Sequence, residues 1–299
     1  MKSPDYIRDK IKSILQLPAL PAHAYEVVEL VDNPKSNAAQ LARTISSDPA
    51  LSAKVLRMAN SPFYGFPKKI STIDFAIIVL GFDTLKEIVI SISLMSALQN
   101  NKDTHLDLDV FWDHSLSSAI LARKLARETG YRLPSEAFIA GLLHDLGILV
   151  IHKYFHADYI KIQELIRETE TSPLEAEESI LGVTHADIGR WLAERWNLPA
   201  HLCEAIASHH TSEAIEDDKR LTALIHVADV LSNAGFAASY DFDKGLTFNR
   251  SALHLLGLDG DEVLKKYYDT AETSVDEQNN TGQHDTATAD VPEQSSDKV

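Results

Sequence analysis

The sequence predicts an all-α protein, and three observations lead to this prediction. Helix start and stop signals recur along the chain. The alternation of apolar and polar residues that is typical of strands is nearly absent. The composition, with 44% hydrophobic and 24% charged residues, is that of an ordinary soluble globular protein, and 299 residues are enough for a sizeable core. We therefore expect a body built of one helix after another.

Helices in the first hundred residues are placed by side chains that can cap a helix N-terminus. Such caps accept hydrogen bonds from first-turn N–H groups, which have no partner within the helix. The expected helices are 49–60, opened by Asp48 and Pro49; 72–80, opened by a capping box of Ser71 and Asp74 and closed by Gly81; and 83–98, capped by Asp83. Residues 87–94 alternate briefly like a strand, but they lie inside the last of these segments and are predicted to be helical.

The same signals continue after the mostly polar stretch 99–108, which is the best internal joint and separates two groups of helices. The helices expected beyond it are 110–129, capped by Asp109 and ended by Gly130; a strongly apolar helix that contains His144 and Asp145; one opened by Ser172, Pro173 and Glu175 and stopped by Gly182; one opened by Thr184 and Asp187 and ended by Asn197 and Pro199; and one after Pro199 that ends at His209 and His210.

The net charge limits the classes of partner. The chain has 28 Lys and Arg residues against 44 Asp and Glu residues, which gives a formal charge of −16. Proteins that bind nucleic acids or anionic membranes generally neutralise phosphates with Lys and Arg, so we expect neither general nucleic-acid binding nor membrane binding. Residues 271–299 are polar and acidic with almost no large apolar side chain, and we expect them to be disordered.

Cysteine content and hydropathy indicate where the protein works. Cys203 is the single cysteine, which excludes an intrachain disulfide and a Cys-rich zinc site and fits a reducing cytoplasm. No apolar stretch that could serve as a secretory signal follows Met1. The longest apolar stretches, 75–82 and 88–95, are too short to cross a bilayer. We expect a soluble cytoplasmic protein.

Histidines with aspartate partners are the residues that carry chemistry. His144 and Asp145 stand in apolar surroundings where an uncompensated charge is costly, and a metal ion would satisfy both. Further candidates come about one per helix, and side chains on different helices of a bundle can converge on a shared ion. The full set is His114, His144, Asp145, His185, His209, His210 and Asp229. Two carboxylates and five imidazoles are too many for one tetrahedral ion and suit a two-metal centre with a bridging aspartate.

The ligand types also narrow the choice of metal. Imidazoles and carboxylates without a thiolate favour Fe, Mn, Ni or Zn over Mg or Ca, so the expected cofactor is two divalent transition-metal ions. The alternative is a set of histidines that hydrogen-bond each other without any ion. Asp187 is a candidate to orient a ligand, and His226 is a candidate neighbour of the site because it lies three residues before Asp229. The histidines expected outside the site are His23, His105, His152, His156, His201, His254 and His284.

The ordered series of candidates resembles the metal-binding series of HD-superfamily phosphohydrolases, in particular the HD-GYP group. The stretch from about Leu17 to Asn233 looks like the HDOD family, a relative found in bacterial signalling proteins. Its N-terminal marks here are Leu17-Pro18-Ala19-Leu20-Pro21, Ser47-Asp48-Pro49-Ala50-Leu51, Lys54-Val55-Leu56-Arg57-Met58-Ala59-Asn60-Ser61, and Ile73-Asp74-Phe75-Ala76 through Leu80-Gly81. The resemblance implies a multi-helix bundle in two closely packed lobes. It divides the chain into an N-terminal helical lobe (1–100), an HD-like lobe with the metal site (101–235), a C-terminal helical extension (236–270) and the acidic tail (271–299).

The resemblance also implies which residues hold which ion. One ion would be held by His114, His144, Asp145 and Asp229, and the second would share Asp145 and take His185, His209 and His210. Two positions depart from the phosphodiesterase pattern. Thr211-Ser212-Glu213 stands in place of Gly-Tyr-Pro, and Ile148 stands in place of a lysine that meets a substrate phosphate. Both departures weigh against the cleavage of a cyclic dinucleotide.

Two functions from different classes are compatible with these features. The first is a bacterial signalling protein that retains an HD-type dinuclear metal site and acts through contacts with a signalling protein partner. The second is a metal-dependent phosphohydrolase, a phosphodiesterase that takes a nucleotide or cyclic nucleotide as its ligand. The two departures and the acidic body favour the first function, whereas the intact ligand set favours the second.

Overall fold

A computed structural model describes residues 4–14, 26–27, 29–30, 33, 35–60, 69–98, 105–169, 171–210, 219–235 and 246–267. All regular structure in these ranges is α-helical and none is a strand, which confirms the predicted fold class. The helices are α1 (Pro4–Ile14), α3 (Ala38–Ser46), α4 (Pro49–Ala59), α5 (Ile73–Leu80), α6 (Phe82–Leu98), α7 (Leu108–Glu128), α8 (Pro134–Leu143), α9 (Leu146–Tyr154), α10 (His156–Thr169), α11 (Pro173–Leu181), α12 (His185–Arg195), α13 (Ala200–Ser208), α14 (Arg220–Gly235) and α15 (Arg250–Leu256). The expected tail 271–299 lies outside the described residues.

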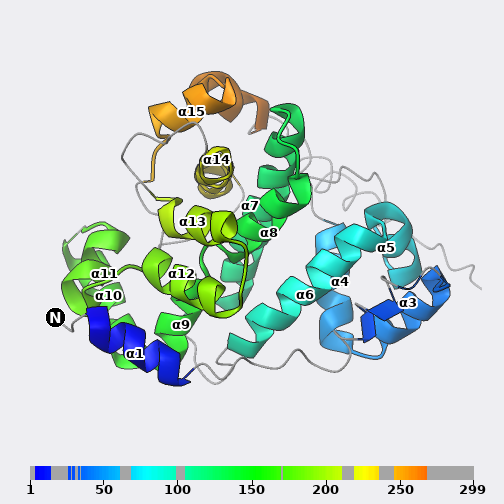
Figure 1. The fold of residues 1–299 in the computed structure, drawn as a ribbon, viewed down its shortest axis with the longest axis horizontal. Coiled ribbons are helices and arrows are strands. Elements are labelled where there is room, and N and C mark those ends of the chain that lie inside the picture. Colours follow the sequence, from blue (N-terminus) through cyan, green and yellow to red (C-terminus); the bar gives the residue numbers. More distant parts are fainter. Residues whose placement is uncertain are drawn as a thin grey trace, which may run out of the picture.

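The helices form two groups that pack against each other (Figure 1). Helices α3, α4 and α5 lie together at one side, and α6 runs from them to contact α8 and α9. In the second group α7 packs against α8 and α14, and α9 packs against α12. One cluster of buried apolar side chains continues through both groups, from Leu41 in α3 to Ile206 in α13. The two lobes therefore share a core.

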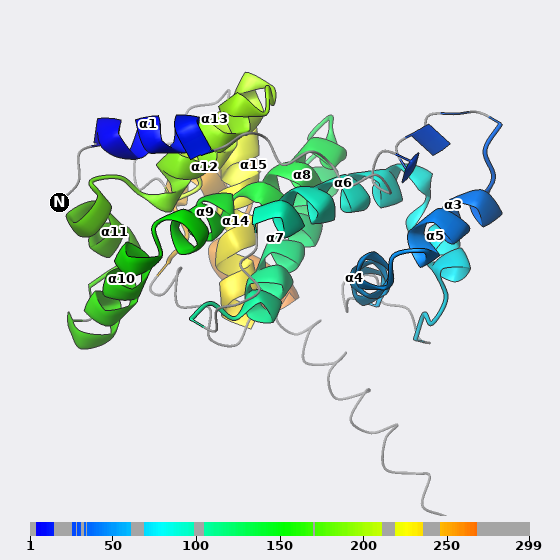
Figure 2. The same ribbon diagram turned by 90° about the horizontal axis from the view of Figure 1, so that it is seen from below.

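Helix α1 lies with the second group although it precedes α3 in the sequence (Figure 2). The Lys10 ammonium donates to the Tyr154 carbonyl oxygen at 3.4 Å. The Arg8 guanidinium lies 5.6 Å from the centroid of the Trp191 ring in α12. Helix α1 thus packs over α9, which begins directly after Asp145, and over α12, which begins at His185.

Three of the predicted helix starts are confirmed by cap geometry. The confirmed caps are Asp48 for α4, Ser172 with Glu175 for α11, and Thr184 with Asp187 for α12. The predicted start of α5 was wrong by one residue. The side chain of Thr72, and not that of Ser71, accepts the hydrogen bond from the Phe75 N–H group.

Two other starts were also predicted wrongly, because another acceptor comes earlier in the chain. Asp107 caps α7 by accepting from the N–H groups of Asp109 and Val110, so Asp109 lies inside the first turn. Asp83 lies inside α6, which begins at Phe82. The preceding residue, Gly81, has a φ of 79° that favours glycine, and its carbonyl oxygen accepts the first hydrogen bond of α6.

The prediction of one apolar helix through His144 and Asp145 was wrong, because the chain turns there. Helix α8 ends at Leu143 and α9 begins at Leu146, with Asp145 in a non-helical conformation at φ −95° and ψ 12°. The stretch Pro134–Tyr154 is long and apolar enough, by length and composition alone, to cross a membrane. Of its most apolar window, 78% is buried inside the protein, and the turn interrupts it. This stretch therefore belongs to the core, and its turn places His144 and Asp145 inside the core.

Candidate metal centre

The seven predicted side chains come together at one place in the second group of helices. They come from α7, the turn between α8 and α9, the start of α12, the end of α13 and the middle of α14. Their potential ligand atoms form two sets, and within each set the atoms lie within 4.8 Å of one another. The sets are Asp145, His185, His209 and His210, and His114, His144 and Asp229. The seven side chains divide as the resemblance implies, except that Asp145 falls in the first set alone.

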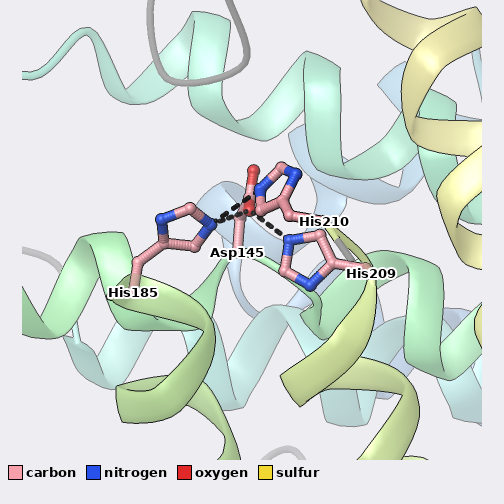
Figure 3. A group of neighbouring side chains, drawn as sticks. All are labelled: Asp145, His185, His209 and His210. Atoms are coloured by element: carbon pink, nitrogen blue, oxygen red, sulfur yellow. Dashed lines mark hydrogen bonds and ion pairs between the residues drawn. The ribbon is translucent and has the colours of Figure 1, made fainter. Parts of the chain in front are cut away.

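Asp145 lies between the two sets, and each of its oxygens faces a different one. Its Oδ1 atom is 3.3 Å from Nε2 of His185 and 3.5 Å from Nε2 of His209. Figure 3 shows both imidazoles beside this carboxylate. Its Oδ2 atom is 3.2 Å from Nε2 of His144 and 3.4 Å from Nε2 of His114. This is the placement that a bridging carboxylate requires.

Asp229 is the second carboxylate of the centre, and it is fully buried. Its Oδ1 atom lies 3.2 Å from Nε2 of His114 and 3.6 Å from Nε2 of His144. Its Oδ2 atom lies 3.8 Å from Nδ1 of His210. Neither oxygen accepts a hydrogen bond from protein. A buried carboxylate is costly unless a positive charge compensates it, so this side chain fits a cation that would neutralise it.

The tautomers of two histidines are set by backbone carbonyl groups. Nδ1 of His144 lies 2.7 Å from the Gly141 carbonyl oxygen, and Nδ1 of His209 lies 2.6 Å from that of Ile206. Because a carbonyl oxygen only accepts, each Nδ1 must carry the proton and donate it. In the neutral rings Nε2 is then an acceptor, and in both residues it points at Asp145. When these rings are neutral, acceptors thus face the carboxylate across the centre, and this arrangement fits a cation between them.

His185 is oriented by the carboxylate of Glu177, which is not among the residues predicted from the sequence. Its Nδ1 atom lies 2.9 Å from Oε2 and 3.0 Å from Oε1 of the buried residue Glu177 in α11. Asp187, the residue proposed for this task from the sequence, does something else. Its carboxylate accepts from the backbone and hydroxyl of Thr184, both at 3.0 Å, and caps α12. A carboxylate eight residues before the histidine carries no local signal that marks it as a partner.

His226 lies beside the centre and supports it through the backbone. Its Nδ1–H group donates to the His209 carbonyl oxygen at 2.7 Å, and its Nε2 atom accepts from the Asn249 N–H group at 2.8 Å. Both ring nitrogens are thus engaged away from the carboxylates. The structure places this side chain next to the site, as the sequence had suggested, and outside the two ligand sets.

The electrostatics of the centre favour positive charge. Burial lowers the pKa of His144, but the carboxylates of Asp145 and Asp229 outweigh this effect and raise the pKa well above its usual value. For His185, burial is likewise outweighed by Glu177 and Asp145, which raise its pKa. Burial raises the pKa values of Asp145 and Asp229, but the surrounding imidazoles hold both well below the usual range. The carboxylates are therefore ionised and attract cations.

His209 and His210 behave in the opposite way. Burial lowers the pKa of both residues, and the charge of neighbouring imidazoles lowers them further. Their rings lie 3.9 Å apart between centroids, so a proton on one disfavours a proton on the other. Neutral imidazoles are the form that binds a metal, and the residues present fit one.

Two glycines set the spacing of the helices around the centre. A Cβ atom on Gly147 would lie 1.9 Å from the carbonyl oxygen of His185, where no side chain fits. A Cβ atom on Gly141 would lie 2.9 Å from Cα of Ala119 in α7. Because these glycines flank His144 and Asp145, they let α9 approach α12 and α8 approach α7 closely enough for the ligands to converge.

Comparison with known proteins places these features in a family. The model of the HDOD domain matches residues 17–212. A crystal structure of an HDOD domain protein with unknown function from Geobacter sulfurreducens is 26% identical, with a TM-score of 0.66, and the match covers 92% of this chain and 96% of that one. A candidate phosphohydrolase from Shewanella amazonensis is 28% identical, with a TM-score of 0.63, and the match covers 91% and 96%.

A curated relative extends the comparison to sequence. An uncharacterized protein of Treponema pallidum is 30% identical over 226 residues, which is 75% of this chain and 43% of the relative. The present chain thus spans less than half the length of that relative.

Proposed function

Because this chain belongs to the HDOD domain family, we propose that it is a bacterial regulatory protein that binds a signalling protein partner and holds two divalent transition-metal ions in its core. The ions would have a structural or sensory role. One would be held by His114, His144, Asp229 and the shared Asp145. The other would share Asp145 and be held by His185, His209 and His210. Ligands of these types favour Fe, Mn, Ni or Zn.

The observation that carries this proposal is the burial of the centre. Six of the seven ligand side chains are 0% exposed, and the side chain of the seventh, His210, is 6% exposed. A hydrolase has to admit its substrate to the reacting atoms, whereas a structural or sensory ion is best kept from solvent. Shielded ligands with fixed tautomers therefore support a regulatory role.

A phosphohydrolase is the second candidate, and it is supported by the Shewanella amazonensis neighbour and by the bridging position of Asp145. When bound, two ions would supply Lewis-acid chemistry to a phosphate ester. The residues of this chain weigh against it. Ile148 is fully buried in α9 and offers no charge to a phosphate, and the body of the chain is acidic. Hydrolysis thus remains the weaker proposal.

Metal analysis of the purified protein, combined with turnover assays on a panel of cyclic and linear nucleotides, tests both candidates. We expect about two transition-metal ions per chain and no cleavage, as a dinuclear regulatory site requires. The double variant His144→Ala, Asp145→Ala should lose most of the metal, whereas His254→Ala, a change of an exposed histidine in α15, should keep it. Cleavage that disappears in the double variant would establish the enzyme instead. A protein without bound transition metal would refute both candidates.

A further inference from the structure

Glu177 has a fully buried carboxylate and lies outside both ligand sets. It accepts hydrogen bonds from two N–H groups of one candidate ligand, His185. Its Oε2 atom accepts from the backbone N–H group of His185 at 2.7 Å. The imidazole Nδ1–H group of the same residue lies 2.9 Å from Oε2 and 3.0 Å from Oε1. Two donors from one residue thus compensate for the burial of this charge.

In His144 and His209, the Nδ1–H group donates to an uncharged backbone carbonyl oxygen. The difference from His185 follows from where these residues lie in their helices. His144 and His209 follow the last residues of α8 and α13, where carbonyl groups three residues earlier are free to accept from Nδ1. His185 is the first residue of α12. A helix N-terminus offers free N–H donors and no free carbonyl acceptors, so the acceptor for His185 has to come from another element. Helix α11 supplies it as a carboxylate.

The two halves of the centre also differ in charge. His114 and His144 share their half with a carboxylate of its own, Asp229. The half around His185 contains three imidazoles and has only the bridging Asp145 as an anionic ligand. The negative charge of Glu177 reaches this half through the His185 ring. A carboxylate on Nδ1–H fixes the ring orientation and makes Nε2 a more basic ligand.

We infer that Glu177 is a positioning residue that selectively strengthens metal binding in the half formed by Asp145, His185, His209 and His210. This inference rests on the proposed function, because it requires that ions bind. It assigns to one buried carboxylate the role that Asp229 has in the other half. Asp229 acts by direct contact, and Glu177 acts through an imidazole.

A cobalt(II) titration of the full chain, followed by calorimetry and by the visible spectrum, tests the inference with Glu177→Gln. This variant keeps the shape of the side chain and removes its charge. We expect one of the two ions to bind about 10–100-fold more weakly, while the other keeps its affinity. The matched control is Asp187→Asn, which removes a carboxylate charge two residues after His185 that only caps α12. It should keep both affinities.

The possible outcomes separate this inference from the proposed function. A wild-type chain that binds no cobalt(II) would overturn the proposed function and the inference with it. A wild-type chain that binds two ions, with Glu177→Gln binding both equally well or losing both equally, would overturn the inference alone. The same loss in Asp187→Asn would also overturn it.

The wild-type chain offers a measurement that needs no variant. In zinc-loaded protein with 15N-labelled histidine, the Nδ1 proton of His185 should resonate further downfield than those of His144 and His209, because its acceptor is charged and the hydrogen bond is stronger. Equal positions for the three protons would overturn the inference even if Glu177→Gln did not fold.

Discussion

The nitrogen that carries the proton in each imidazole decides what the ring can do at the centre. In His144 and His209 the choice is local, because the acceptor lies three residues earlier in the same helical turn. In His185 the choice depends on Glu177, a residue of another helix. The same residue type is thus oriented in two ways. A sequence pattern can reveal the first way, since position at a helix end is readable, but it cannot reveal the second.

Gly147→Ala tests how tightly the centre depends on one missing side chain. The new Cβ atom would overlap the His185 carbonyl oxygen at 1.9 Å, so α9 and α12 would have to separate. We expect a loss of about 3 kcal/mol in the free energy of unfolding, measured in denaturant, because overpacking against backbone cannot be relieved by a side-chain rotation. Metal affinity should fall as well. In Gly260→Ala the Cβ atom meets only side-chain atoms, of Leu253 at 3.1 Å and of Phe248 at 3.6 Å, and this control should change neither quantity much. Wild-type stability in Gly147→Ala would contradict the close approach.

At the scale of elements, the helix ends show which boundaries a sequence pattern can predict. Caps such as Asp48 and the Thr184–Asp187 box were predicted because the accepting side chain and its donors lie within four residues. The start of α7 was missed because two aspartates lie two residues apart and each could serve as the cap. The turn at His144 and Asp145 was missed because it contains no Gly, Pro or Asn. Tertiary packing against α7 and α12 decides where that stretch bends.

Asp107→Ala distinguishes the observed cap of α7 from the predicted one. Loss of the two hydrogen bonds from the N–H groups of Asp109 and Val110 should cost about 1 kcal/mol of unfolding free energy. Asp109→Ala should cost clearly less, because Asp109 makes an exposed ion pair with Arg57, and such pairs contribute little. Chemical denaturation of both variants measures the difference. A larger cost for Asp109→Ala would restore the start that the sequence predicted.

The helical residues 260–267 should detach from α7 in acid. Burial raises the pKa of Glu128, but hydrogen bonds from Lys266 and Tyr267, at 2.6 and 2.7 Å, outweigh this and lower it. Because the folded pKa lies below the unfolded value, the carboxylate stabilises this contact fully above about pH 4.3, and the contribution is lost as the pH falls through the folded pKa. Hydrogen exchange of residues 260–267 should therefore accelerate in that window. In Glu128→Gln the pH dependence should disappear, and an unchanged pH profile would argue against this anchor.

At the scale of the whole molecule, the centre joins helices that are far apart in the sequence. If two ions bind, their removal should destabilise the entire second group and not one helix. At a free metal concentration of 100 times Kd, each ion contributes about 2.7 kcal/mol, so chelation should lower Tm by roughly 5–10 °C per ion. Differential scanning calorimetry with and without chelator measures this. The double variant His144→Ala, Asp145→Ala should show no such shift, and a chelator-insensitive wild type would argue against bound metal.

The fold class and the gathering of the seven side chains at one place were predictable from the sequence for different reasons. Helical periodicity and caps are local, so they were visible without knowledge of the tertiary structure. The grouping of His114 with Asp229 is not local, and it was reached only through the resemblance to a family. Neither the local signals nor the resemblance identifies Glu177, since it neither caps a helix nor belongs to the ligand series. The packing of α1 on α12 was also not predicted, because no feature of the α1 sequence indicates which helix it contacts.

The order of the ligands along the chain has a consequence for biogenesis. Asp229 lies in α14, near the end of the second group of helices, and contributes to the same set as His114 in α7. A nascent chain therefore cannot complete that set until almost the whole domain has left the ribosome. An ion bound to this set earlier would meet only part of its ligands, whereas the set of Asp145, His185, His209 and His210 is complete by residue 210. If ions bind, the one held with Asp229 would therefore be inserted last.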